Sequence, residues 1–352
     1  MININHHHIY FLQKMINNNI GVNFQGFESS AYQNRKTPTP PRDYIEDSFQ
    51  IFSKNNIFML RVPYSWESWE CDKSNFYEDL EKISKVADAY NILCIYDNHQ
   101  WEGSSWLGWG VGMPNSLLSA NYQKNTGRRP NRNVIKDFWK KWWNHKIINR
   151  DNVDGWEAQI SFVKEVISYL NNNKSTFGFE ILNEPQVYHV LDYNKVGHYH
   201  NYAMQELRKC TDKLLFFNAA ISHIPFDNPI LQSRVAPTTR VNTVYDVHMY
   251  PPSSYNMQFF RLVCSLLQNV QIYIGEFNSG YKYGANLSKN KLMNYLETFH
   301  KFKLFGWALW RWYYTQDSNI PAFNLTKICN GKISQNINFC NLIEALRGIY
   351  LQ

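Results

Sequence analysis

Short apolar runs recur along the chain, and most are followed by a segment with a different hydrophobic period. Eight runs have the length and composition of buried strands, at residues 20–24, 57–62, 92–98, 176–182, 213–217, 244–250, 270–275 and 304–310. Between them, apolar residues recur every three or four positions in residues 76–90, 156–170 and 292–302, which predicts amphipathic helices. Residues 218–243 show no convincing helical pattern, so we expect that connection to be mostly loop.

The alternation of strands and helices favours one architecture. Near-continuous apolar strands that alternate with helices are typical of a parallel sheet covered by helices. Eight such units predict a single-domain (β/α)8 TIM barrel of the α/β class, with a long Trp-rich loop after the third strand. A doubly wound sheet would need a phosphate-binding loop after its first strand, but "GVNFQGFES" contains no G-x-G-x-x-G. We expect residues 20–352 to form the barrel domain and residues 1–19 to be an N-terminal extension.

Polar and aromatic residues gather at the ends of the predicted strands. In a TIM barrel the active site lies at the carboxyl ends of the strands. Six predicted strands end in residues suited to such a site, namely Arg61, His99, Asn183 with Glu184, His248 with Tyr250, Glu276, and Trp310. Asp246, His248 and Tyr250 also share one face of their strand, because side chains alternate along a strand. The ends of several strands therefore indicate one common site.

Two of these residues are carboxylates that can face each other across the barrel mouth. Glu184 ends the fourth predicted strand and Glu276 the seventh. Glycoside hydrolysis requires such a pair, because one carboxyl group protonates the leaving oxygen while the other attacks the anomeric carbon or activates water. An isolated Glu is more often a salt-bridged structural residue. We expect this structural role for Glu180, inside the fourth strand, and a supporting role for Asp97.

Several motifs together resemble glycoside hydrolase family five, or cellulase family A. These are "LNEP" and "IGEF" at the fourth and seventh strand ends, "LRVPYSW" after the second strand, "DVHMY" at the sixth, "GWALWRW" at the eighth and "GVNFQGFE" at the first. The resemblance covers roughly residues 20 to 312. It implies a retaining enzyme in which Glu184 is the general acid/base and Glu276 is the nucleophile.

The same resemblance implies roles for the other residues at the strand ends. Arg61 would lie near Glu276 and keep it ionised, since a neighbouring cation lowers the pKa of a carboxyl group. Tyr250 would donate a hydrogen bond to the same carboxylate, and His248 would border Glu184. The three remaining residues would contact sugar at the cleavage subsite: His99 and Asn183 through its hydroxyl groups, and Trp310 as a floor under its ring.

The tryptophans point to a carbohydrate cleft by a separate argument. Of 12 Trp, seven lie at the end of a predicted strand or in the segment that follows it: Trp66, Trp69, Trp101, Trp106, Trp109, Trp310 and Trp312. Sugar rings stack their C–H faces on aromatic side chains, so we expect Trp66 and Trp101 to contact substrate. The loop over residues 100–153 is too long for a plain connection in a compact domain, and we expect it to form a wall of the cleft.

The predicted substrate is an extended, neutral β-1,4-linked polysaccharide or an oligosaccharide derived from it. This predicts an endo-β-1,4-glucanase acting on cellulose or β-glucan, with endo-β-1,4-mannanase or another β-glycan hydrolase as the alternative. No metal or organic cofactor is needed for that chemistry. Two hypotheses from other classes are a non-catalytic carbohydrate-binding barrel and a metal-dependent hydrolase that uses His99, His248 and Glu276.

Charge and hydropathy argue against two kinds of partner, nucleic acid and a membrane-spanning environment. The net charge is +7, but Lys and Arg are scattered, and the densest basic stretch, residues 126–133, is expected to be a solvated loop. We therefore expect no nucleic-acid partner, and we expect a monomer. No run reaches the roughly 18 apolar residues of a membrane span. The substrate class favours an extracellular or cell-surface location, although residues 1–19 do not resemble a signal peptide.

Overall fold

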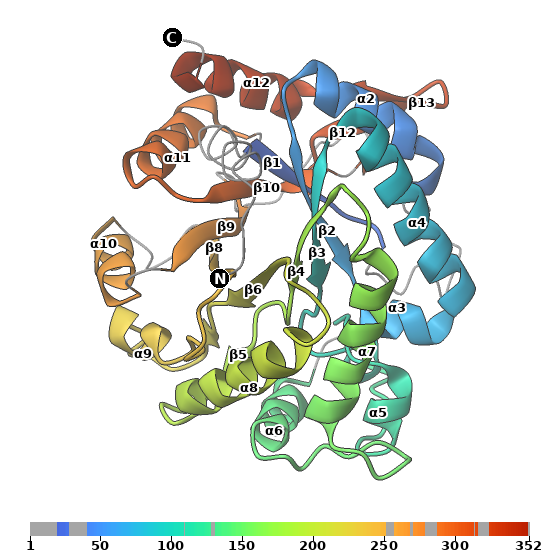
Figure 1. The fold of residues 1–352 in the computed structure, drawn as a ribbon, viewed down its shortest axis with the longest axis vertical. Coiled ribbons are helices and arrows are strands. Elements are labelled where there is room, and N and C mark those ends of the chain that lie inside the picture. The colour runs from blue at the N-terminus through green and yellow to red at the C-terminus, as the bar shows by residue number, and fades with distance from the viewer. Residues whose placement is uncertain are drawn as a thin grey trace.

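A closed barrel of eight parallel strands forms the centre of the described part of the protein (Figure 1). The computed structural model describes residues 20–27, 41–108, 110–127, 131–250, 257–267, 270–278, 287–312, 314–315 and 324–350. The barrel strands are β1 (Ile20–Phe24), β2 (Met59–Tyr64), β3 (Leu93–Asn98), β4 (Thr176–Glu180), β6 (Leu214–Asn218), β8 (Thr243–Met249), β9 (Gln271–Phe277) and β10 (Gly306–Trp312). The predicted TIM barrel is confirmed, whereas the predicted extension over residues 1–19 lies outside the described residues.

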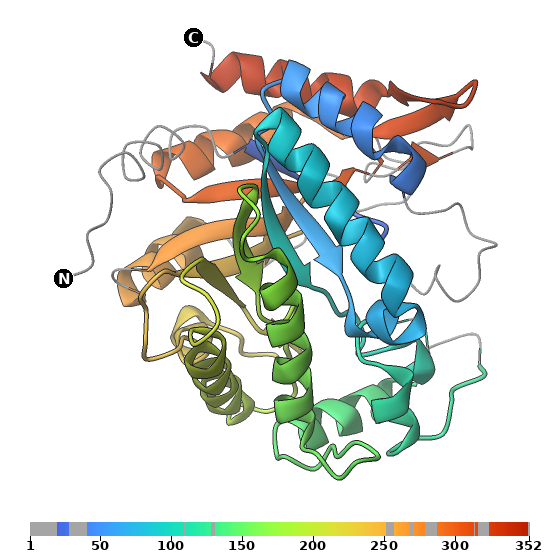
Figure 2. The same cartoon turned by 45° about the vertical axis from the view of Figure 1, so that its right-hand side comes forward.

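Helices surround the barrel on its outer face (Figure 2). The longer ones are α2 (Ile45–Lys54), α4 (Lys73–Tyr90), α6 (Arg132–Trp142), α7 (Gly155–Leu170), α8 (Asp192–Leu207), α10 (Met257–Leu266), α11 (Lys289–Lys301) and α12 (Ile337–Tyr350). The shorter ones are η2 (Pro41–Tyr44), α3 (Trp66–Cys71), η3 (Ser105–Leu107), α5 (Asn115–Ser119) and α9 (Pro229–Ser233). Within residues 218–243 only the five-residue α9 is helical, which confirms that this connection is mostly loop.

Local signals in the sequence explain where the helices begin and end. The Asp72 carboxylate accepts a hydrogen bond from the backbone N–H of Asn75 at 3.1 Å and caps α4. That helix stops at Asn91, whose φ of 55° is left-handed, a conformation that Asn tolerates. On α7 the predicted apolar stripe is buried from Trp156 to Leu170. None of the helices in the described ranges is long and apolar enough to cross a membrane.

The interior of the barrel changes from apolar to polar along the strands. At its base lie Met59, Ile95, Phe216, Val244, Tyr273, Phe305 and Ala308, which form a small buried cluster. Two residues further along their strands, Met59 is followed by Arg61 and Val244 by Asp246, both fully buried. Because side chains two apart on a strand point to the same face, this second layer is polar and lies directly beneath the carboxyl ends of the strands.

The loop after β3 contains the helices η3, α5 and α6. The Glu67 carboxylate of α3 accepts hydrogen bonds from the backbone N–H groups of Ser105 at 3.3 Å and Gly112 at 3.1 Å. Further along the loop, Trp139 and Trp142 on α6 are fully buried, so these tryptophans form part of the core. The loop is therefore folded, and one buried carboxylate ties it to the helix that follows β2. That it forms a wall of the cleft stays a prediction.

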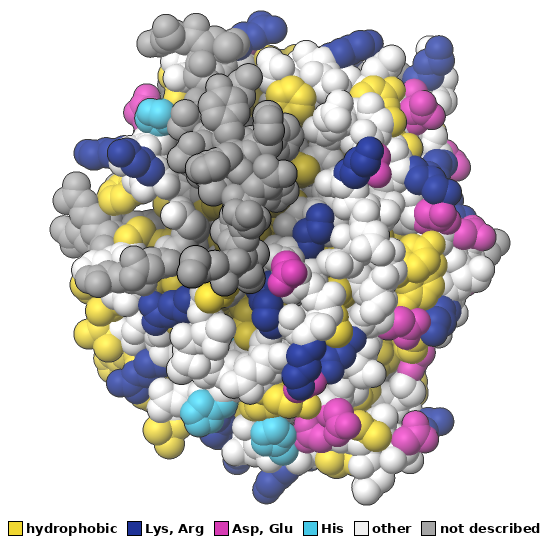
Figure 3. Space-filling model, viewed as in Figure 1, with side chains coloured by type: hydrophobic (Ala, Val, Ile, Leu, Met, Phe, Trp, Pro, Cys, Tyr) yellow, Lys and Arg dark blue, Asp and Glu magenta, His cyan; other side chains and the backbone are white. Residues whose placement is uncertain are grey.

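The C-terminal segment adds a small sheet and a helix to the barrel. Strands β11 (Tyr314–Thr315), β12 (Thr326–Cys329) and β13 (Lys332–Gln335) form a three-stranded sheet, and α12 packs against α11. A further two-stranded sheet pairs β5 (Gln186–Val187) with β7 (Ile221–Ser222) just beyond β4 and β6. On the face shown in Figure 3, basic and acidic side chains are interspersed among neutral ones.

Candidate active site

Arg61 lies at the centre of the polar layer and organises the site. It is fully buried on β2, and its Nη1 donates to Oε1 of Glu276 at 2.8 Å. Its Nε and Nη2 both donate to Glu180 at 2.8 Å, and Nη2 also lies 3.0 Å from Oδ2 of Asp97. Burial lowers the pKa of Arg61, but the surrounding carboxylates outweigh burial and raise it above its ordinary value. The expected structural role of Glu180 is confirmed, since it forms a two-point ion pair with Arg61.

Glu276 ends β9 in a setting that favours its charged form. Its side chain accepts hydrogen bonds from Arg61 and, at 2.8 Å, from the hydroxyl of Tyr250. Burial raises the pKa of Glu276, but the nearby positive charges of His248, Arg61 and His99 overcome burial and lower it. This carboxylate is therefore ionised at neutral pH and fixed in position. The family resemblance implied both contacts, with Arg61 beside Glu276 and Tyr250 donating to it.

Glu184 follows β4 in a left-handed backbone conformation with a φ of 45°. Two amides hold this conformation: Nε2 of Gln100 donates to the carbonyl oxygens of Asn183 at 2.8 Å and Glu184 at 2.7 Å, and Oδ1 of Asn218 accepts from the Glu184 N–H at 3.3 Å. A non-glycine residue seldom adopts positive φ without such support. The strand thus ends in a turn that presents the Glu184 side chain, 17% of which is exposed, to the barrel mouth.

His248 brings the two candidate catalytic carboxylates together. Its Nδ1 lies 2.7 Å from Oε1 of Glu184 and 3.6 Å from Oε2 of Glu276. One oxygen of each carboxylate and one His248 nitrogen all lie within 4.8 Å of one another. Burial lowers the pKa of His248, but Glu276, the hydrogen bond with Glu184 and the charge of Asp246 raise it to about 10. The sequence prediction that His248 borders Glu184 is confirmed by this contact.

The side chains expected to contact sugar lie around this pair. The His99 ring stacks on Trp310, with 5.8 Å between ring centroids and 16° between planes, and its Nδ1 is 2.7 Å from Oδ2 of Asp97. Asp97 thus supports His99, as expected. Asn183 is already engaged by protein, because its Oδ1 accepts from Arg61 at 2.7 Å and its Nδ2 donates to Gln100 at 2.9 Å. One Nδ2 hydrogen is left over, so a direct contact of Asn183 with sugar stays a prediction.

The tryptophans divide into exposed and buried groups, which corrects one expectation. Trp101 is 44% exposed, as a sugar-stacking residue requires. Trp66 is 8% exposed and stacks on Phe162 of α7 at 5.7 Å, so it belongs to the packing between helices rather than to the cleft surface. Trp312 is likewise buried, against Phe52. Trp109 lies outside the described residues.

Three further polar residues, which the sequence pattern did not single out, help to build the site. Gln100 and Asn218 hold the Glu184 turn, and Asn23 on β1 accepts a hydrogen bond from Nη1 of Arg61 at 3.0 Å. Each lies at or near the end of a predicted strand, in "GVNF", "DNHQ" and "FFNAA". The signal was present in the same pattern that identified Glu184, but amides at strand ends are also common in turns.

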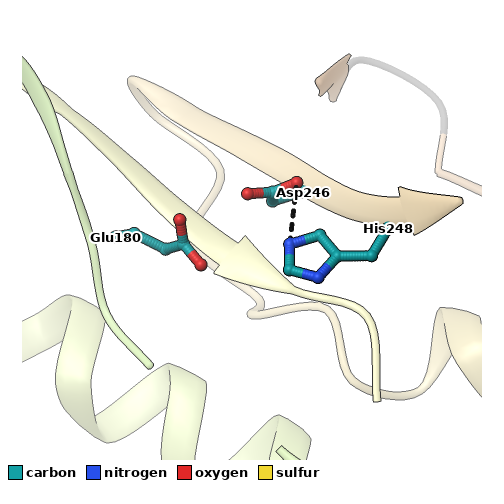
Figure 4. A group of neighbouring side chains, drawn as sticks. All are labelled: Glu180, Asp246 and His248. Carbon is teal, nitrogen blue, oxygen red and sulfur yellow. Dashed lines mark ion pairs between the residues drawn. The ribbon is translucent and has the colours of Figure 1, made fainter. Parts of the chain in front are cut away.

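The metal-dependent hypothesis required His99, His248 and Glu276 to act together. Among the described residues, two groups have the spacing of metal ligands: Glu180, Asp246 and His248, shown in Figure 4, and Glu184, His248 and Glu276. His99 belongs to neither. The carboxylates of Glu180 and Glu276 already accept hydrogen bonds from the cationic Arg61, which offsets negative charge that a bound metal ion would otherwise balance.

Comparisons with known proteins place the chain in a class and then in a family. Residues 15–316 match the family model Cellulase (glycosyl hydrolase family 5). The protein is therefore a glycoside hydrolase, and it belongs to glycosyl hydrolase family 5. A comparison with curated proteins gave no match.

Solved structures share the fold at low sequence identity. Endo-glycoceramidase II from Rhodococcus sp. is 13% identical with a TM-score of 0.67, over 93% of this chain and 77% of that chain. The Pseudomonas stutzeri endoglucanase Cel5A in complex with cellobiose is 15% identical with a TM-score of 0.59, over 93% of this chain and 92% of that chain. At such identities the likeness shows the barrel fold alone.

Proposed function

We propose that the protein is a retaining endo-β-glycosidase in which Glu276 is the nucleophile and Glu184 is the general acid/base. The observation that carries the proposal is the spacing of these carboxylates, whose facing oxygens lie within 4.8 Å of each other. Retaining enzymes keep the two groups about 5–5.5 Å apart, whereas inverting enzymes need roughly 6.5–9.5 Å to admit a water. In a non-catalytic barrel, nothing would require one carboxylate to be held by Arg61 and Tyr250 while the other is partly exposed beside His248.

The reaction follows from those surroundings in two balanced steps. In the first, an oxygen of Glu276 attacks the anomeric carbon, the bond to the leaving oxygen breaks, and Glu184 gives its proton to that oxygen. A glycosyl ester of Glu276 forms and the leaving sugar departs. In the second, water attacks the same carbon, Glu184 takes the proton from the water, and the ester bond breaks. Two inversions give a product with retained configuration.

Neighbouring side chains prepare the nucleophile Glu276 and position the sugar for the first step. Arg61 and Tyr250 hold Glu276 ionised and oriented through hydrogen bonds of 2.8 Å each. His99 and Trp310, stacked on each other, are proposed to bind and floor the sugar that carries the reacting carbon. The exposed Trp101 on the loop after β3 is proposed to stack a further sugar ring.

The substrate we propose is a β-1,4-linked glucan, which makes the enzyme an endo-β-1,4-glucanase. The likeness to solved endoglucanases and the exposed tryptophan support an extended neutral polymer. Reducing-sugar release from carboxymethylcellulose, mixed β-glucan, mannan and xylan tests this, with lactosylceramide as a further arm because endo-glycoceramidases share the fold. Cleavage of the glucans supports the proposal. Cleavage of mannan or of the glycolipid alone would contradict the proposed substrate and keep the mechanism.

A polymeric substrate also bears on where the enzyme works. Because a polysaccharide does not enter a cell, we propose that the enzyme acts outside the cell or at its surface, and as a monomer. Activity measured in the culture medium and in washed cells of a producing strain tests the location. Size-exclusion chromatography with light scattering tests the monomer, for which a mass near 41.8 kDa is expected.

A further inference from the structure

Asp246 lies beneath the candidate catalytic pair and plays no part in the two steps above. It is fully buried on β8, two residues before His248 and on the same face of the strand. Its Oδ1 accepts a hydrogen bond from the backbone N–H of Gly275 at 2.7 Å. The same oxygen lies 3.9 Å from Nε2 of His248, the contact marked in Figure 4.

Gly275, the residue before Glu276, makes room for the Asp246 carboxylate. A Cβ atom added to Gly275 would lie 2.2 Å from Oδ2 and 2.4 Å from Oδ1 of Asp246. Both distances are far inside van der Waals contact, so any side chain at position 275 would displace the carboxylate. Two positions of the sequence, on neighbouring strands, are thus matched to place one negative charge behind His248.

The two edges of the His248 ring face different groups. Nδ1 faces Oε1 of Glu184 at 2.7 Å, whereas Nε2 faces Asp246. In the described part of the chain, Nε2 of His248 and Oδ2 of Asp246 are buried and have no hydrogen-bond partner. A buried polar atom without a hydrogen-bond partner is costly, so the charges near that edge of the ring matter. Asp246 supplies one of them, and a Glu180 oxygen lies within 4.8 Å of a His248 ring nitrogen.

We propose that Asp246 is a positioning residue for hydrolysis: it keeps His248 as an imidazolium, whose Nδ1–H donates to Oε1 of Glu184. This inference rests on the proposed role of Glu184. With Oε1 occupied by that hydrogen bond, the transferable proton of Glu184 is held on Oε2, toward the leaving oxygen. When Glu184 loses this proton, the negative charge that develops faces a fixed positive charge. His248 itself neither gains nor loses a proton in the cycle.

The charges around His248 agree with this arrangement. The groups that surround it are Glu180 and Glu184 from β4 and its end, Glu276 from β9, Asp246 from its own strand, and Arg61 and Tyr250, which both donate to Glu276. Nε of Arg61 also lies 3.8 Å from Oδ2 of Asp246. Burial lowers the pKa of His248, but its anionic neighbours raise it to about 10. Burial and the charge of Glu180 raise the pKa of Asp246 well above its ordinary value, although His248 and Arg61 lower it. The pKa values of both partners are therefore raised, and because unperturbed imidazole is the more basic of the two groups, we assign the shared proton to Nε2 of His248.

Nitrogen NMR of the 15N-histidine-labelled protein tests the inference directly, with His248→Gln used to assign the signal. In the wild type, both ring nitrogens of His248 should be protonated at pH 7 and remain so to about pH 9. In Asp246→Asn, which keeps the shape and removes the charge, His248 should lose its proton at least about one pH unit lower. A neutral His248 in the wild type at pH 7 would overturn the proposal, and so would an unchanged titration in Asp246→Asn.

Controls separate this role from general damage and from the proposed function. Asp79→Asn changes another buried aspartate, which pairs with Arg42 outside the barrel, and should leave both the His248 titration and the rate unchanged. Asp246→Asn should lower kcat about tenfold with little change in KM. The decline of kcat at alkaline pH should begin at lower pH than in the wild type, because His248 loses its proton earlier in this variant. If that variant does not fold, the wild-type titration alone decides. Because NMR needs no turnover, absence of hydrolysis would refute the proposed function, whereas the titrations would still decide whether Asp246 keeps His248 charged.

Discussion

The ends of β9 and β4 present the two candidate catalytic carboxylates in contrasting surroundings. Glu276 has 6% of its side chain exposed, and its oxygens accept hydrogen bonds from Arg61 and Tyr250. Glu184 has 17% of its side chain exposed, faces His248, and is held mainly through its backbone. A nucleophile must stay ionised and fixed, whereas an acid/base must exchange a proton with the leaving group and with water. The difference between the two strand ends therefore matches a difference in chemical role.

The largest expected effect comes from removing the nucleophile. Glu276→Gln keeps the size of the side chain but cannot form the glycosyl ester, so kcat should fall by at least about 10⁴-fold on every substrate. Steady-state hydrolysis of the best polymer and of an aryl glycoside measures the loss. A variant that retains a tenth of the wild-type rate on either substrate would remove Glu276 from this role.

Loss of the acid/base should depend on the leaving group. Glu184→Gln should slow polysaccharide cleavage by about 10²- to 10⁴-fold, because a sugar alkoxide needs protonation to depart. A nitrophenolate leaves without protonation, so the first step with a nitrophenyl glycoside should be far less affected. Pre-steady-state release of nitrophenol measures that step. Equal losses on both substrates would make the two strand ends chemically alike and contradict the comparison.

Arg61 connects the two sides of the site, and its loss should also affect stability. Arg61→Met leaves Glu180 and Glu276 buried without their shared cation, which should lower the free energy of unfolding by about 3–5 kcal/mol. Urea denaturation measures the change. Lys85→Met is the control, since its pair with Glu81 joins side chains that are 71% and 47% exposed and should contribute little to the free energy of unfolding. Similar losses of unfolding free energy in the two variants would show that the buried Arg61 cluster stabilises the fold no more than a surface ion pair does.

Two tryptophans sharpen the distinction between core and cleft. Trp66→Ala should cost about 3–5 kcal/mol of stability, because it removes a buried ring that stacks on Phe162. Trp101→Ala should leave stability nearly unchanged and weaken polymer binding by about 1–2 kcal/mol through the loss of a stacking surface. Thermal unfolding and KM for polysaccharide separate the two effects. If Trp66→Ala instead weakened polymer binding and left stability unchanged, Trp66 would belong to the cleft surface.

The smallest expected effect is a change in the acid dependence of stability. Glu276 has a folded-state pKa below its unfolded value, because the neighbouring positive charges outweigh burial. Its contribution is therefore present above the unfolded pKa, about 4.3, and is lost as pH falls through the folded pKa. Unfolding free energies between pH 6 and pH 3 should fall more steeply in the wild type than in Glu276→Gln. Parallel curves would mean that Glu276 is not stabilised in its charged form.

The barrel and both carboxylates could be predicted from the sequence for a physical reason. Buried parallel strands leave continuous apolar runs, and a polar residue at the end of such a run, as at Glu184 or Glu276, stands out against them. The role of Trp66 could not be predicted in this way, since a tryptophan after a strand can face the cleft or the next helix. The match between Asp246 and Gly275 depends on which strands are neighbours and on atomic spacing, and neither is visible along the chain.

Chemical trapping tests the central claim most directly. The enzyme is incubated with the 2-deoxy-2-fluoro analogue of the glycoside it cleaves best, carrying a good leaving group, so that the glycosyl ester forms quickly and hydrolyses slowly. Proteolysis and mass spectrometry then locate the added sugar. The account predicts one sugar per chain, on the peptide that contains Glu276. A sugar on any other residue, or turnover with inverted configuration and no trapped ester, would contradict it.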